Sequence, residues 1–137
     1  MSKVLYKPVT YHGIEYYPYF VDASGDIYNA ETGNHLTPTS DTTCKYPRVS
    51  MKDSNGKYKR YLMHRIVAEA FVPLTLPKNS DINEEEWEMT PQSVKKFIMK
   101  SMLVNHIDHD KENYDHKNLE WVTSEENAAA RNKFYGI

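Results

Sequence analysis

One short segment constrains the fold more than any other part of the sequence. It spans residues 103–131 and reads LVNHIDHDKENYDHKNLEWVTSEENAAAR. Here LVNHID is β-like, HDKENYDHK is polar and typical of a loop, and NLEWVT returns to an alternation of apolar side chains. Thr123 with Glu126 matches a capping box, and the alanines that follow favour a helix. The segment therefore predicts a strand, a loop, a second strand and a helix in close succession.

The N-terminal part of the chain is typical of antiparallel strands. Residues 16–23, YYPYFVDA, and parts of 27–36, IYNAETGNHL, are aromatic, β-branched and bounded by turn residues. Residues 46–65 predict a hairpin, because Asn55-Gly56 is the strongest short-range hairpin signal and both residues tolerate a positive φ. Residues 10–63 thus predict a small antiparallel sheet.

Two helical regions are predicted between that sheet and the C-terminal segment. Residues 62–72, LMHRIVAEAFV, have apolar side chains at helical spacing and are followed by Pro73. Residues 82–103 predict a helix in two pieces, with Thr90 as the N-cap of the second piece. The predicted apolar stripe of that second piece consists of Val94, Phe97 and Ile98.

Several classes of protein are excluded by the residue content. The single cysteine, Cys44, rules out an internal disulfide framework and a cysteine-based structural zinc site. The first residues lack the apolar core of a signal peptide, and no apolar run is long enough to span a bilayer. We therefore expect a cytoplasmic protein with no membrane partner.

Charge is distributed unevenly although the formal net charge is only −2. Residues 45–65 are strongly basic with Asp53 as the single acid, whereas residues 81–88 are acidic without a base. Such asymmetry allows one face to be positive, the alternative being two ordinary solvated surfaces. A basic hairpin along a groove would contact phosphates, which gives affinity without reading sequence, while Tyr46 or Tyr58 could reach base edges. The candidate DNA-contacting residues are Arg48, Lys52, Lys57, Lys59, Arg60, Lys111 and Arg131.

The histidines and asparagines of the C-terminal segment fit one chemistry better than others. A calcium loop starting at Asp108 fails, because Asn113 replaces the required glycine and Leu119 the required glutamate. His106 and His109 would supply only two zinc ligands. Phosphodiester hydrolysis needs a base to activate water and a cation to offset developing charge. Histidine can be that base, and Mg²⁺ needs few protein ligands.

The segment resembles the HNH nuclease motif, also called the ββα-metal finger, in the version found in phage and intron-encoded homing endonucleases. The resemblance lies in VNHID, KNLEWVT and EEN. The first histidine of the motif matches His106, its central asparagine matches Asn118, and its final metal-binding residue matches Asn127. Upstream, YFVDASGDIYN and MHRIVAEAFVP resemble the small β-module that precedes this motif in many such endonucleases.

The resemblance implies a role for each matched residue. His106 would deprotonate the attacking water, and Asn118 would hydrogen-bond the backbone across the hairpin and orient His106. Asn105 and Asn127 would bind one divalent cation, Mg²⁺ or Mn²⁺. Asp108 is either a partner that supports His106 or a plain loop acid.

The resemblance also implies an α+β fold and a function. The expected architecture is an N-terminal antiparallel sheet with one packed helix (1–77), an acidic and helical insertion (78–102) and a C-terminal ββα-metal finger (103–137). The expected function is a phage-encoded, metal-dependent endonuclease of double-stranded DNA. It would nick one strand as a monomer and cut both as a homodimer or in two events. The alternatives are an inactive DNA-binding finger and an accessory protein that binds a protein partner through 78–102.

Overall fold

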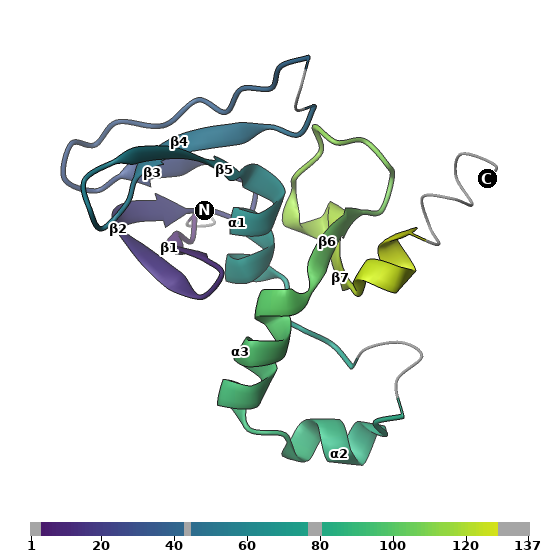
Figure 1. The fold of residues 1–137 in the computed structure, drawn as a ribbon. Coiled ribbons are helices and arrows are strands. Elements are labelled where there is room, and N and C mark those ends of the chain that lie inside the picture. The colour runs from purple at the N-terminus through teal and green to yellow at the C-terminus, as the bar shows by residue number, and fades with distance from the viewer. Residues whose placement is uncertain (1–3, 43–44, 77–80, 129–137) are drawn as a thin grey trace.

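The computed structural model describes residues 4–42, 45–76 and 81–128 and has the predicted α+β architecture (Figure 1). The described strands are β1 (Lys7–Tyr11), β2 (Ile14–Val21), β3 (Ile27–Asn29), β4 (Arg48–Lys52), β5 (Tyr58–Leu62), β6 (Leu103–His106) and β7 (Leu119–Val122). The helices are α1 (Met63–Phe71), α2 (Glu84–Met89), α3 (Gln92–Ser101) and the short 3₁₀ helix η1 (His116–Asn118). None of the helices in the described ranges is long and apolar enough to cross a membrane.

The N-terminal strands form two sheets where one was predicted. Strands β1, β2 and β3 make an antiparallel sheet, and β4 and β5 make a separate hairpin. The sequence signal for β1 is weak because Pro8 lies within it. The turn from β1 to β2 uses His12 and Gly13, both at positive φ. The hydroxyl of Tyr19 accepts a hydrogen bond from the backbone of Lys52 at 3.1 Å and so links the two sheets.

The predicted hairpin at Asn55-Gly56 is confirmed. Arg48 pairs with Leu62 at one end of the β4–β5 ladder. At the other end, the carboxylate of Asp53 accepts backbone hydrogen bonds from Asn55 at 2.9 Å and Lys57 at 3.0 Å. Of the Asn-Gly pair, only Gly56 has a positive φ. The turn therefore depends on the Asp53 carboxylate as well as on the glycine.

Helix α1 joins the N-terminal sheets to the C-terminal hairpin. Its residues Ile66 and Val67 are completely buried, and the core extends from Val9 in β1 to Leu119 and Trp121 in β7. The indole nitrogen of Trp121 donates a hydrogen bond to the carbonyl of Val72, just past the end of α1, at 2.8 Å. The hairpin of β6 and β7 therefore shares one continuous core with the N-terminal sheets. The predicted domain boundaries remain a prediction.

The insertion is helical in two pieces, as predicted, but two details of that prediction are wrong. Thr90 does not cap α3: it ends α2, and its hydroxyl donates to the carbonyl of Glu86 at 2.7 Å. The N-cap of α3 is Pro91. Val94 and Phe97 do not face the core and are 44% and 74% exposed. The contact with the core is made by Ile98 and Met99.

A buried ion pair fixes the end of α3. Arg65 in α1 contacts the carboxylate of Glu69 at 2.8 Å and donates to the carbonyls of Met99 and Met102. A cation at the carbonyl end of a helix is favourable because it meets the negative end of the helix dipole. Glu69 also accepts from the backbone of His12 at 2.7 Å. This network joins α1, α3 and the β1–β2 turn.

Candidate active site

The hairpin of β6 and β7 positions the residues of the motif. His106 is the last residue of β6 and lies opposite Leu119, and Asn105 lies opposite Glu120. The loop between the two strands ends in η1. Asn127 lies in a helical segment, residues 124–128, that follows β7 directly. The predicted order of strand, loop, strand and helix is confirmed within the described residues.

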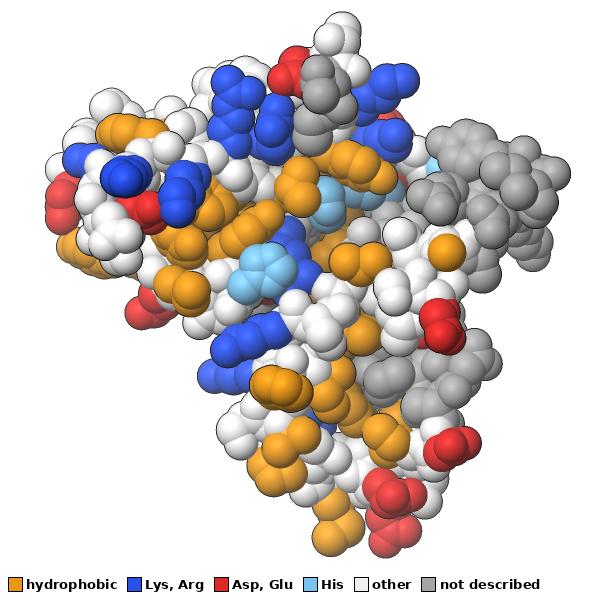
Figure 2. All heavy atoms as spheres, viewed as in Figure 1, with side chains coloured by type: hydrophobic (Ala, Val, Ile, Leu, Met, Phe, Trp, Pro, Cys, Tyr) orange, Lys and Arg blue, Asp and Glu red, His pale blue; other side chains and the backbone are white. Residues whose placement is uncertain are grey.

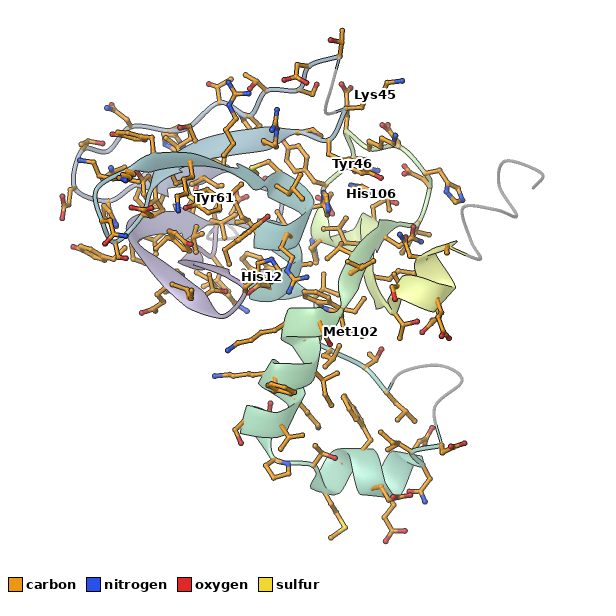
Figure 3. The ribbon with its side chains drawn as sticks, viewed as in Figure 1. His12, Lys45, Tyr46, Tyr61, Met102 and His106 are labelled. Carbon is orange, nitrogen blue, oxygen red and sulfur yellow. The ribbon has the colours of Figure 1, made fainter. Side chains whose placement is uncertain are left out.

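His106, Asn105 and Asn127 line one cavity of about 460 Å³. The cavity is bounded by residues from distant parts of the chain, and Figure 3 shows the ring of Tyr46 beside His106. The full set of lining residues is Tyr46, Leu62, His64, Leu103, Val104, Asn105, His106, His109, Lys111 and Asn127. The structure thus brings together the proposed base and both proposed metal ligands.

The imidazole of His106 is held in an aromatic cluster. Its ring centroid lies 4.8 Å from that of His64, edge to face, and 5.6 Å from that of Tyr46. His106 is buried, and its Nε2 atom has no hydrogen-bond partner in the part of the chain that the structure describes. Burial lowers the pKa of His106 below 6.5, although Asp108 and Asp110 oppose this. The ring is therefore neutral near pH 7, as a general base must be.

Asn118 connects the two sides of the loop. Its amide oxygen accepts from the backbone N–H of Asp108 at 3.1 Å, and its amide nitrogen donates to the carbonyl of Asn113 at 2.8 Å. The same nitrogen donates to the Asp108 carboxylate at 2.9 Å. Asn118 therefore orders the loop that follows His106 and makes no hydrogen bond to the His106 ring.

Asp108 is engaged within the loop. Hydrogen bonds from Asn113, from the backbone of Asp110 and from Asn118 hold the pKa of its carboxyl below the usual range. Its effect on His106 is electrostatic rather than through a hydrogen bond. The hydrogen bonds of Asp108 lie within the loop, and its support for His106 stays a prediction.

Comparison with protein families shows to which family this chain belongs. The sequence profile of the HNH endonuclease family matches residues 61–129, half of the chain. The chain belongs to the HNH endonuclease family. A comparison with curated proteins gives no match.

The fold resembles a solved HNH structure. That structure is described as DNA binding and cleavage by the HNH homing endonuclease I-HmuI. The two folds have a TM-score of 0.63 at 23% sequence identity. The match covers 97% of this chain and 60% of the I-HmuI chain, so this chain spans less than two thirds of that protein. At this identity the likeness concerns the fold.

Glu120, a residue that the sequence analysis missed, contacts Asn105 beside the cavity. The amide nitrogen of Asn105 donates a hydrogen bond to the carboxylate of Glu120 at 2.9 Å. This leaves the amide oxygen of Asn105 as the atom available to a cation. The strand register would have revealed Glu120. In an antiparallel pair, placing His106 opposite Leu119 also places Asn105 opposite Glu120.

The donor atoms fit a hard cation held by few protein ligands. Among the described residues, no group of three or more His, Cys, Asp or Glu gathers to hold a metal ion. The oxygen donors at the cavity are instead the side-chain amides of Asn105 and Asn127. Mg²⁺ takes oxygen ligands, keeps several waters and uses substrate phosphate oxygens, so it needs only one or two protein ligands, most often carboxylates.

The basic residues of the hairpin lie on the face away from the core. Val49, Met51 and Tyr61 are buried, so alternation along the strands turns Arg48, Lys52 and Arg60 outward. Figure 2 shows Lys and Arg side chains gathered over this hairpin and above the hollow that holds histidines.

Some of these charges already have partners. Arg48 and Arg60 lie 3.0 and 3.7 Å from the carboxylate of Asp41, and Lys59 lies 3.2 Å from Asp53. Lys111 lies over the ring of Tyr46 at 5.0 Å, at the cavity itself. Arg131 lies outside the described residues. The pair of Arg60 and Asp41 is exposed on both sides, and exposed ion pairs contribute little to stability.

Substitution of Asn118 by alanine should loosen the loop. The change removes three side-chain hydrogen bonds and leaves the Asn113 carbonyl without this donor. We expect Asn118→Ala to lower the free energy of unfolding by about 1–3 kcal/mol, measured by urea denaturation. The matched control is Asn113→Ala, because that side chain makes a single hydrogen bond, to Asp108. Equal effects of the two substitutions would contradict the assigned role of Asn118.

Burial of His64 should make the protein sensitive to acid. Burial, together with the charges of His106 and Arg65, lowers the pKa of His64 to about 3. Between pH 6.5 and 3 the unfolded chain therefore binds a proton that the folded chain excludes, so stability falls as the pH falls. We expect a loss on the order of 5 kcal/mol from this residue, measured by urea denaturation at several pH values. His64→Phe should flatten that dependence, and an unchanged pH dependence would contradict it.

Proposed function

We propose that this protein is a metal-dependent DNA endonuclease that hydrolyses phosphodiester bonds. The observation that carries the proposal is that His106, Asn105 and Asn127 line one cavity, as the HNH motif requires. Membership of the HNH endonuclease family supports the same reaction.

His106 is proposed as the general base. Its ring is neutral near pH 7 and lines the cavity, where it would take the proton of the attacking water. Asn118 positions His106 indirectly, by ordering the loop that leaves β6. General base catalysis contributes about 10²–10⁴-fold to a rate.

Asn105 and Asn127 are proposed to hold a single Mg²⁺ or Mn²⁺ through their amide oxygens. Such an ion, when bound, offsets negative charge on the phosphate and the leaving oxygen. Glu120 engages the amide nitrogen of Asn105 and so keeps its oxygen turned away from that carboxylate. A nearby carboxylate also adds favourable charge for a cation.

The substrate is proposed to be double-stranded DNA lying across the β4–β5 hairpin. The outward face of the hairpin carries Arg48, Lys52 and Arg60 and leads to Leu62, which lines the cavity. With one site per chain, a monomer nicks one strand. We further propose that the protein is phage-encoded and acts in the cytoplasm of the bacterial host.

The products of plasmid cleavage test this function. Supercoiled plasmid incubated with the protein and Mg²⁺ or Mn²⁺ should become open circles, and EDTA should prevent this. Hydrolysis by an activated water leaves 5′-phosphate and 3′-hydroxyl ends, so DNA ligase should reseal the nicks. Binding of DNA without nicking in either metal would contradict the proposal, as would nicks that ligase cannot close.

A further inference from the structure

The lysines of α3 do not line the cavity of the proposed active site. The helix has the sequence QSVKKFIMKS and contains three lysines and no acid. The ammonium of Lys95 lies 4.8 Å over the ring of Trp87, so this lysine is occupied within the insertion. Lys96 and Lys100 are one turn apart and share a face of the helix. No ion pair involves either of them within the described residues.

Lys96 and Lys100, with Phe97 between them, form what is here named the α3 lysine face. Phe97 is 74% exposed. Apart from Asp81, the acids of the insertion belong to α2: Glu84, Glu85, Glu86 and Glu88. In Figure 2 lysine side chains lie along α3 near its upper end, and acidic side chains lie at the lower right of the arm. The insertion therefore separates its charges, and α3 carries the positive side.

The side chain of Lys100 is positioned by the β1–β2 turn. A Cβ atom at Gly13 would come within 2.8 Å of the Cε atom of Lys100, so the lysine stem passes close to the bare glycine backbone. Both residues, with Lys95 and Lys96, line a second cavity of about 430 Å³. The carboxylate of Glu69 also borders it but is engaged by Arg65 and by backbone N–H groups.

The end of α3 is fixed relative to the active site. Arg65 binds the carbonyls of Met99 and Met102, and β6 begins at the next residue, Leu103. Leu103 lines the active-site cavity from the side of α3, and Leu62 lines it from the side of the β4–β5 hairpin. Two basic surfaces therefore approach the same cavity from different elements.

We propose that the α3 lysine face binds the phosphate backbone of the same DNA duplex that enters the active site, on the β6 side of the cavity. The inference rests on the proposed function, because it takes DNA as the partner. Ammonium groups that form no ion pair within the described residues complement phosphates. Leu103, the first residue of β6 and part of the cavity wall, follows Lys100 by three positions. Phe97 supplies an apolar contact to sugars or bases beside them.

Salt-dependent DNA binding tests this inference. Affinity for a fluorescent duplex is measured by anisotropy in EDTA over a range of salt concentrations. Each of Lys96→Gln and Lys100→Gln should lower the slope of log affinity against log salt by about one, and the double variant by about two. The matched control is Lys95→Gln, which removes the same charge from the same helix where the lysine already lies over Trp87. Its slope should stay close to that of the wild type.

The outcomes separate this inference from the proposed function. If the wild type binds and nicks DNA but the double variant keeps the wild-type slope, the α3 contact is wrong and the nuclease assignment stands. A double variant no weaker than Lys95→Gln would also overturn it. If the wild type neither binds nor nicks DNA, the proposed function fails and the inference fails with it. Circular dichroism of each variant checks that α3 is retained.

Discussion

Replacement of His106 by alanine should abolish nicking while leaving DNA binding intact. The proposed base is removed, and the cavity keeps Asn105 and Asn127. We expect a fall in the single-turnover nicking rate of about 10²–10⁴-fold at saturating metal and DNA. The rate is measured on supercoiled plasmid with Mn²⁺, and binding is measured on the same DNA in EDTA.

The neighbouring histidine provides a matched control. His64 lies 4.8 Å from His106, lines the same cavity and is also buried, but burial and nearby positive charge lower its pKa to about 3. His64→Phe keeps an aromatic ring there and should retain most of the activity. Loss of activity in His64→Phe with retention in His106→Ala would reverse the assignment of the base.

Replacement of Arg65 by methionine should have the largest effect on stability. The change leaves the buried carboxylate of Glu69 without its cation and removes the donors to the carbonyls at the end of α3. Breaking a buried pair by removing one partner costs about 3–5 kcal/mol. Chemical denaturation of wild type and variant measures the difference. Hydrogen exchange should also become faster in α3 and β6, because Arg65 joins them to α1.

Neutralising the partner should recover part of that loss. In the double variant Arg65→Met/Glu69→Gln no uncompensated charge is buried, and the glutamine oxygen can still accept from the His12 backbone. The double variant should therefore be more stable than Arg65→Met alone. A single variant within about 1 kcal/mol of the wild type would contradict the role of Arg65 as the tie between α1 and α3.

The sequence predicted the C-terminal hairpin well because several local signals agree there. Alternating apolar residues, a polar loop and the Thr123–Glu126 cap all favour the observed strand, loop, strand and helix. His106 and Asn127, which the spacing of the motif singles out, line one cavity in the fold together with Asn105, the residue before His106.

The remaining features depend on contacts that a linear pattern does not contain. Tyr46, which precedes β4, and His64, in the first turn of α1, reach the cavity from segments that only the tertiary fold brings next to β6. The apolar stripe of α3 was assigned wrongly because its core-facing side is set by the carbonyl contacts of Arg65, a residue distant in sequence. The apolar pattern alone places Phe97 on the core-facing side, but in the structure its side chain is exposed.

We propose that the cavity around His106 is a nuclease site with one divalent ion. It is tested most directly by the nicking rate of supercoiled DNA as a function of Mn²⁺ concentration. We predict no nicking in EDTA and a rate that rises to a plateau with the dependence of a single binding site. Asn105→Ala and Asn127→Ala should shift that curve to higher Mn²⁺. A rate that does not depend on metal, or no nicking at any concentration by protein that binds the DNA, would contradict the account.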